Sequence, residues 1–181
     1  MIKFTILSIS LVCLFTSCTQ KIDLSYAPVI EKCKKNNVNL AVNTFNDNRQ
    51  KSYIGAKKNL YGISVVKLIT DDDVGQWVTD ALKLEMENAG YTITDQSNNS
   101  GYEIEGKVLE AYATSHFTYK GKMVVKVIVK QDGKEIFRKN YRTKETNGFN
   151  WFARKASCSK ALTLNLQKIC KRFISDFEQL K

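Results

Sequence analysis

Two predicted strands with a turn between them constrain the fold of this chain most strongly. Residues 123–130 and 136–142 contain the valine, isoleucine and aromatic side chains that are typical of strands. Asp132-Gly133 lies between them, and this pair readily adopts the backbone angles that a two-residue type I′ turn requires. The sequence therefore predicts an antiparallel β-hairpin over this part of the chain.

Further strands are expected on both sides of this hairpin. Short apolar or alternating runs bounded by polar loops predict them. The loop between the third and fourth of these strands contains the polar run Gln96-Ser97-Asn98-Asn99-Ser100. The expected strands cover residues 38–42, 63–68, 91–93 and 102–108.

Two amphipathic helices are expected, because apolar side chains recur at intervals of three and four residues. The first follows Asp71-Asp72-Asp73 and ends at Gly90, and the second covers residues 152–180. The apolar stripe of the second helix could lie on a membrane, but packing against a sheet is the more usual role. Residues 38–181 are thus expected to form a single α+β domain. It would be a two-layer sandwich, with a mainly antiparallel sheet of about 4–6 strands packed on two helices.

The first eighteen residues have the features of a bacterial lipoprotein leader. Lys3 precedes an apolar run over residues 4–15. A helix of about 12 residues spans roughly 18 Å, less than the ~30 Å hydrocarbon core, so the run predicts an export signal. Phe15-Thr16-Ser17-Cys18 resembles the lipobox, in which the chain is cut before an acylated cysteine. We expect residues 1–17 to be a signal peptide, Cys18 to be lipidated, and residues 18–37 to include a flexible tether.

Export would place the remaining cysteines in an oxidising compartment. Cys158 and Cys170 lie on the expected second helix, about 18 Å apart, and are too distant to bridge each other. Cys33 could form a disulfide with Cys158 or Cys170, and three free thiols are the alternative. No CxxC pair occurs and His116 is the only histidine, so no metal site is expected.

The sequence contains no motif of a known catalytic or nucleotide-binding class. We interpret the triplet at residues 71–73 as a helix N-cap rather than a metal site. Glu103 and Glu105 are interpreted as the solvated face of a strand rather than an acid–base pair. No catalytic residue and no cofactor are therefore expected. A group of aromatic and basic residues could stack on glycan or single-stranded nucleic acid, but packing at a hairpin end is the simpler role: Tyr112, Phe117, Tyr119, Lys120 and Lys122.

From residue 38 onward the chain resembles the YajG-type family of bacterial lipoproteins. The likeness is carried by residues 38–45 with the turn Asp47-x-Arg49, by Val78-Thr79-Asp80-Ala81-Leu82 to Glu85, by Ala89-Gly90-Tyr91, by residues 104–108 and by Asn140-Tyr141-Arg142. The resemblance implies an α+β fold and a place in the bacterial envelope, and it brings no catalytic residues with it.

These observations predict an envelope lipoprotein that is not an enzyme. The residue after Cys18 is Thr19 and not Asp, which by resemblance to enteric sorting rules indicates the outer membrane, facing the periplasm. The formal net charge of +10 favours anionic partners, although scattered basic residues also fit a generally basic surface. We expect a membrane contact through the lipid, binding or scaffolding of an envelope protein or anionic polymer, and no nucleic-acid partner. The alternatives are a lipid or lipopolysaccharide carrier, which needs an internal cavity, and an envelope hydrolase, which needs clustered acidic residues or His116 in a cleft.

Overall fold

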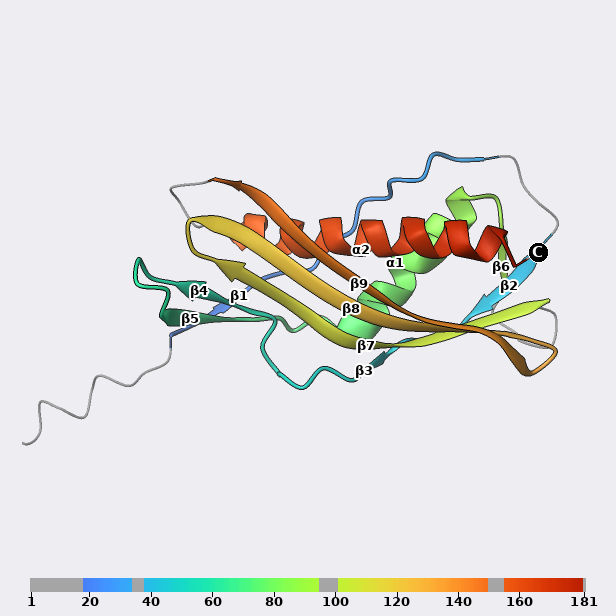
Figure 1. Ribbon diagram of the computed structural model, residues 1–181, viewed down its shortest axis with the longest axis horizontal. Helices are drawn as coiled ribbons and strands as arrows, with labels where there is room; N and C mark the ends of the chain where they lie inside the picture. Colours follow the sequence, from blue (N-terminus) through green and yellow to red (C-terminus); the bar gives the residue numbers. More distant parts are fainter. Residues whose placement is uncertain (1–17, 34–37, 95–100, 150–154, 181) are drawn as a thin grey trace, which may run out of the picture.

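The computed structural model describes residues 18–33, 38–94, 101–149 and 155–180. These form an α+β domain in which helices α1 (Val74–Asn88) and α2 (Lys155–Glu178) pack on a β-sheet and on each other (Figure 1). The predicted fold class and the two predicted helices are confirmed. No helix within the described residues is long and apolar enough to cross a membrane.

Three long antiparallel strands form the centre of the sheet. They are β7 (Tyr102–Ser115), β8 (Thr118–Gln131) and β9 (Lys134–Phe149). Asp132 and Gly133 make the turn between β8 and β9 with φ angles of 50° and 74°. The positive angles at both positions suit this residue pair, so the predicted hairpin is confirmed.

Short strands pair with the other side of β7, one after another along its length. They are β2 (Asn39–Val42), β3 (Asn46–Asp47) and β4 (Gly55–Lys58), all parallel to β7. The sheet is completed by β6 (Thr92–Thr94) beside β2, β5 (Ser64–Ile69) antiparallel to β4, and β1 (Cys18–Lys21) parallel to β5.

The sheet is therefore mixed and has nine strands, more than the predicted 4–6. The predicted antiparallel pairing holds for the three longest strands, whereas most of the short strands pair in parallel. The reason is the length of β7, which provides one long edge for several short strands. Strands of two to four residues, such as β3 and β4, are too short to show a clear alternation in the sequence.

The core lies between the helices and the sheet. Leu162, Leu166, Phe173 and Phe177 of α2 are all 0% exposed, which confirms that the apolar stripe of this helix packs inside the protein. Gly121 of β8 lets the helix approach closely, because a Cβ at this position would lie 2.6 Å from the carbonyl oxygen of Ala161. The space between the layers is filled by such side chains, and this packing does not support the lipid-carrier hypothesis.

The ends of α1 follow the sequence signals. The Asp73 side chain accepts a hydrogen bond of 3.0 Å from the backbone N–H of Gln76 and caps the helix. Gly90, with φ of 93°, follows the last turn. Asp71 pairs with Lys21, and Asp72 accepts from the backbone N–H of Leu24. The acidic triplet therefore has structural partners, and the N-cap interpretation is confirmed.

Candidate functional site

The chain after Cys18 is fastened to the domain, whereas the sequence predicted a flexible tether over residues 18–37. Strand β1 extends the sheet next to β5, and Ile22 is only 2% exposed. Residues 22–33, called here the N-terminal segment, then lie against both helices. Residues 34–37 fall outside the described residues. The tether prediction is thus wrong for residues 18–33, because distant side chains bind this polar stretch.

The first of these partners is a buried carboxylate on α1. Glu85 is 0% exposed and accepts hydrogen bonds from the Tyr26 hydroxyl at 2.5 Å and from the backbone N–H groups of Val29 and Ile30 at 2.8 and 2.9 Å. Burial, with Cys170 and Glu85 nearby, raises the pKa of Tyr26, so its hydroxyl stays protonated and donates. Three donors satisfy a carboxylate that would be costly to bury alone.

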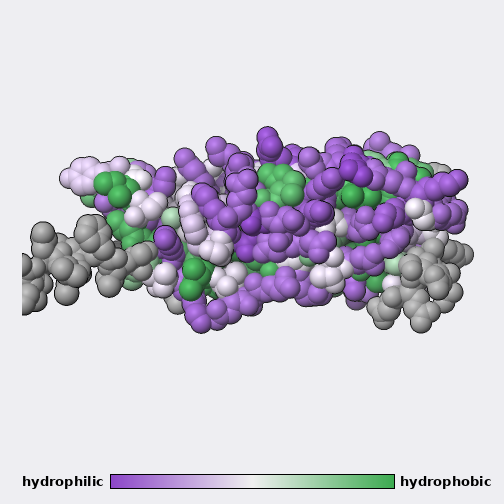
Figure 2. All heavy atoms as spheres, turned by 90° about the horizontal axis from the view of Figure 1, so that it is seen from below, coloured by the Kyte–Doolittle hydropathy of each residue, from purple (hydrophilic) through white to green (hydrophobic). Residues whose placement is uncertain are grey.

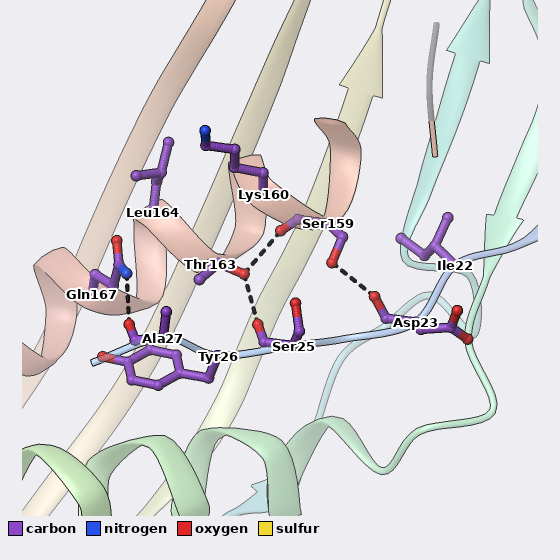
Figure 3. A pocket seen from close by; sticks show the side chains of 10 residues that line it. All are labelled: Ile22, Asp23, Ser25, Tyr26, Ala27, Ser159, Lys160, Thr163, Leu164 and Gln167. Carbon is purple, nitrogen blue, oxygen red and sulfur yellow. Dashed lines mark hydrogen bonds between the residues drawn. The ribbon is translucent and has the colours of Figure 1, made fainter. Parts of the chain in front are cut away.

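The second set of partners is a row of polar side chains on α2. Ser159 Oγ, Thr163 Oγ1 and Gln167 Nε2 donate to the carbonyl oxygens of the segment at 2.7, 2.8 and 2.7 Å, and Figure 3 shows all three directed toward it. Four helical residues rise about 6 Å, and two extended residues cover about 6.6 Å. This match lets every fourth helix residue reach every second residue of the segment. The accepting carbonyls belong to Asp23, Ser25 and Ala27.

A groove of about 560 Å³ lies between the N-terminal segment and α2. We call it the helix groove. Its size is within the range of pockets that bind small molecules or single side chains. Its lining combines apolar side chains with four hydroxyl groups, one carboxylate, one ammonium group and one amide: Ile22, Asp23, Ser25, Tyr26, Ala27, Ser159, Lys160, Thr163, Leu164 and Gln167 (Figure 3).

A second group of side chains lies near the β4–β7 pair. Lys51 Nζ is 4.7 Å from the ring centroid of Tyr112 and 5.5 Å from that of Tyr53, and Lys67 Nζ is 5.8 Å from the Tyr53 ring. The two rings meet edge to face at 5.9 Å. We call these four residues the tyrosine–lysine cluster. A pocket of about 350 Å³ lies beside it and includes Arg49.

The aromatic and basic residues considered for stacking do not form one surface, and the buried Tyr119 fits the favoured role of packing at a hairpin end. Tyr112 meets Tyr53 rather than Tyr119, which is only 3% exposed. Lys122 pairs with Glu110 at 2.7 Å, and Phe117 lies at the β7–β8 turn. Sequence reasoning missed Lys51 and Tyr53 because they lie in a loop far from Tyr112 in the chain.

The motif Asp47-x-Arg49 forms an ion pair within one turn. Arg49 Nε lies 2.9 Å from Asp47 Oδ1, and Nη2 lies 2.8 Å from Oδ2. The hydrogen bonds from Arg49 lower the pKa of Asp47 below its ordinary value of 3.8. This motif thus has a structural role, next to the bulge of β7 after Val108.

The cysteines occupy three different environments. Cys18 is exposed at the start of β1, and Cys33 is exposed at the end of the N-terminal segment, where its Sγ lies 3.5 Å from the Glu31 carbonyl oxygen. Cys158 and Cys170 are buried in α2. Among the described cysteines none is bonded to another, so the disulfide of Cys33 with Cys158 or Cys170 is not formed in this structure.

The titratable residues weighed for catalysis do not come together. Glu103 and Glu105 lie near the start of β7, where Glu103 accepts from Asn43 and Glu105 pairs with Lys130. His116 follows the far end of the same strand. Within the described ranges, no three His, Cys, Asp or Glu residues are grouped so as to hold a metal ion.

By its fold, the protein is a small α+β domain in which two helices pack on a mixed nine-stranded sheet and the N-terminal segment is bound to both helices. The chain belongs to the family of uncharacterised lipoproteins of the YajG type, whose model matches residues 27–179. The resemblance found in the sequence is thereby confirmed, and membership of a lipoprotein family indicates a bacterial envelope location.

Solved structures show the same fold at very low sequence identity. A protein of Xanthomonas campestris superposes with a TM-score of 0.56 at 8% identity, covering 86% of this chain and 92% of that one. A hypothetical protein of Chlamydia trachomatis has a TM-score of 0.53 at 9% identity, covering 81% and 96%. No curated protein matches the sequence. The comparisons therefore give the fold and the family but no activity.

Proposed function

We propose that this lipoprotein is a non-enzymatic binding module, held by a lipid on Cys18 at the outer membrane and facing the periplasm. Residues 1–17 are its signal peptide in this proposal. Family membership supports a lipid anchor, and Cys18 is exposed at the start of an edge strand, where acyl chains can leave the domain without disturbing the core.

The helix groove is the binding site in this proposal, and its lining is the observation that carries it. Leu164 and Ala27 offer apolar contacts, while Asp23, Lys160 and Gln167 offer a carboxylate, an ammonium group and an amide. Apolar contacts combined with placed polar groups are typical of sites that fix the orientation of a ligand. The partner is an envelope protein that places an apolar side chain in the groove.

A photo-crosslinking amino acid at position 164 tests this in the native, membrane-held protein. The expected result is one defined crosslinked partner, identified by mass, that also binds the purified mature chain. Leu164→Glu should weaken that binding about tenfold or more, since a charge would replace a desolvated apolar contact. Arg138, exposed on β9, provides the control position. Equal crosslinking from positions 164 and 138, or full binding by Leu164→Glu, would contradict the proposal.

A second candidate is the binding of an anionic envelope polymer by the tyrosine–lysine cluster. The cation–π distances place two ammonium groups at two tyrosine rings, and such a surface can bind sugars by stacking and phosphates by charge. Retention on immobilised lipopolysaccharide should fall severalfold in Tyr112→Ala and be unchanged in Ile136→Ala, at an exposed apolar residue outside the cluster. Equal retention of both variants would exclude this candidate.

A further inference from the structure

One end of the sheet brings together Cys18 and two turns that are distant in the sequence. In the parallel pairing of β1 with β5, Cys18 lies opposite Val66. The turn between β4 and β5 therefore lies just beyond Cys18. The turn between β7 and β8 reaches the same place, since Lys57 lies opposite Ser115 and the His116 Nε2 atom is 3.2 Å from the Leu60 carbonyl oxygen.

This end of the molecule exposes large apolar side chains. Leu60 is 74% exposed, Tyr61 87%, Ile63 62% and Phe117 46%. We call these four residues the apolar tip. Figure 2 shows apolar side chains at the end that carries the β4–β5 hairpin in Figure 1. A cluster of side chains this exposed marks an interaction surface.

The charges on the segments that carry the apolar tip are of one sign. The sequence has no Asp or Glu between Arg49 and Thr70, and none between Glu110 and Asp132. Lys58, Lys67 and Lys120, in the strands that lead to and from the two turns, are exposed. Apolar side chains surrounded by lysines complement the interface of a bilayer that contains anionic lipid headgroups.

We propose that the apolar tip inserts into the interface of the same bilayer that holds the acyl chains of Cys18. This inference rests on the proposed anchor and deepens it. Three strand residues separate the level of Val66 from Ile63, a distance of about 10 Å, so lipid on Cys18 would emerge beside the tip. Because residues 18–33 are bound to the domain, no flexible linker separates the lipid on Cys18 from the tip. The anchor therefore keeps the tip at the membrane surface.

Vesicle binding by a chain that carries no lipid tests the insertion directly. The mature chain with Cys18→Ser is mixed with vesicles of phosphatidylethanolamine and phosphatidylglycerol at 3:1, and Tyr61→Trp in this background reports on the environment of the tip. The expected results are cosedimentation with the vesicles and a blue shift of the Tyr61→Trp emission when vesicles are added. The parent chain should show no such shift. Ile63→Asp should lower the vesicle partition coefficient about tenfold.

The matched control is Ile136→Asp, which adds the same charge at an apolar residue 41% exposed near the opposite end of β8 and β9. It should bind vesicles like the parent chain. An unchanged Tyr61→Trp emission, or equal loss of binding in both Asp variants, would overturn the inference. Palmitate labelling of the unmodified chain separates the two proposals. If the chain takes up no palmitate, the lipid anchor alone is refuted. If the chain is labelled but the Tyr61→Trp emission does not shift, the inserted tip alone is refuted.

Discussion

The pKa of Asp47 lies below that of an ordinary aspartate, because Arg49 donates hydrogen bonds to its carboxylate. A group whose folded-state pKa is lowered stabilises the fold fully above its ordinary value, here 3.8, and loses this effect as the pH falls through the folded-state pKa. We therefore expect Asp47→Asn to be most destabilising near neutral pH. Urea denaturation should show its difference from the wild type shrinking below pH 3.8. A difference that is constant with pH would contradict this.

Glu85 fastens the N-terminal segment through three hydrogen bonds, so Glu85→Gln should loosen it. The amide cannot accept charge-assisted bonds from all three donors, and we expect a loss of about 1.5–3 kcal/mol in the free energy of unfolding. Hydrogen exchange at the backbone amides of Val29 and Ile30 should also become faster. Glu87→Gln, exposed two residues further along α1, is the control and should change stability by less than about 0.5 kcal/mol.

The thiols should differ sharply in reactivity, because their environments differ. Burial raises the pKa of Cys158 to about 11 and that of Cys170 to about 12, so neither forms the reactive thiolate near neutral pH. Cys33 is exposed. Mass spectrometry of the folded Cys18→Ser chain after alkylation is expected to show modification at Cys33 alone, with the other two modified only in denaturant. Rapid labelling of Cys170 in the folded state would show that α2 opens.

At the scale of elements, the contact of α2 with β8 depends on a missing side chain. A Cβ at Gly121 would lie 2.6 Å from the Ala161 carbonyl oxygen and 2.5 Å from Asn165 Nδ2. Gly121→Ala should therefore push the helix away and cost about 1–3 kcal/mol, measured by thermal or urea denaturation. Gly101→Ala is the control, since its Cβ would meet nothing closer than 3.9 Å. Equal stability of the two variants would disprove this packing.

The elements that could be predicted from the sequence are those whose signals are local. Both helices have apolar stripes several turns long, and the β8–β9 hairpin has Asp132-Gly133 at its turn. Strands β1 and β3 have four and two residues, and their place in the sheet depends on pairing with β5 and β7. Such pairing leaves no periodic pattern within the short strand itself.

The helix groove could not be predicted, because the residues that join its two walls are 136–140 positions apart in the chain. The N-terminal segment has the polar composition of a linker. A glutamate in an amphipathic helix is usually exposed, so the sequence does not mark Glu85 as buried. A weak signal was present, however. Ser159, Thr163 and Gln167 recur every four residues beside the apolar stripe of α2, and such a polar row can bind an extended chain.

For the whole molecule, the first test is the chemistry at Cys18. Cells that express Cys18→Ala should yield protein without incorporated palmitate, since only a thiol can form the thioether to the lipid. The chain should also no longer be cut before residue 18, which mass analysis of the purified protein would show. Cys33→Ala, at another exposed thiol, should keep both the label and the cut. Label that persists in Cys18→Ala would place the acyl group elsewhere.

The match between the α2 polar row and the N-terminal segment restricts how this region can change in length. Deleting one residue between Asp23 and Ala27 would turn the outer carbonyl groups to the opposite side, away from Ser159 or Gln167. Deleting two would restore the phase but shorten the link between β1 and Ala27 by about 7 Å. The number of residues in this stretch can therefore change in pairs, whereas an odd change breaks part of the hydrogen-bonded row.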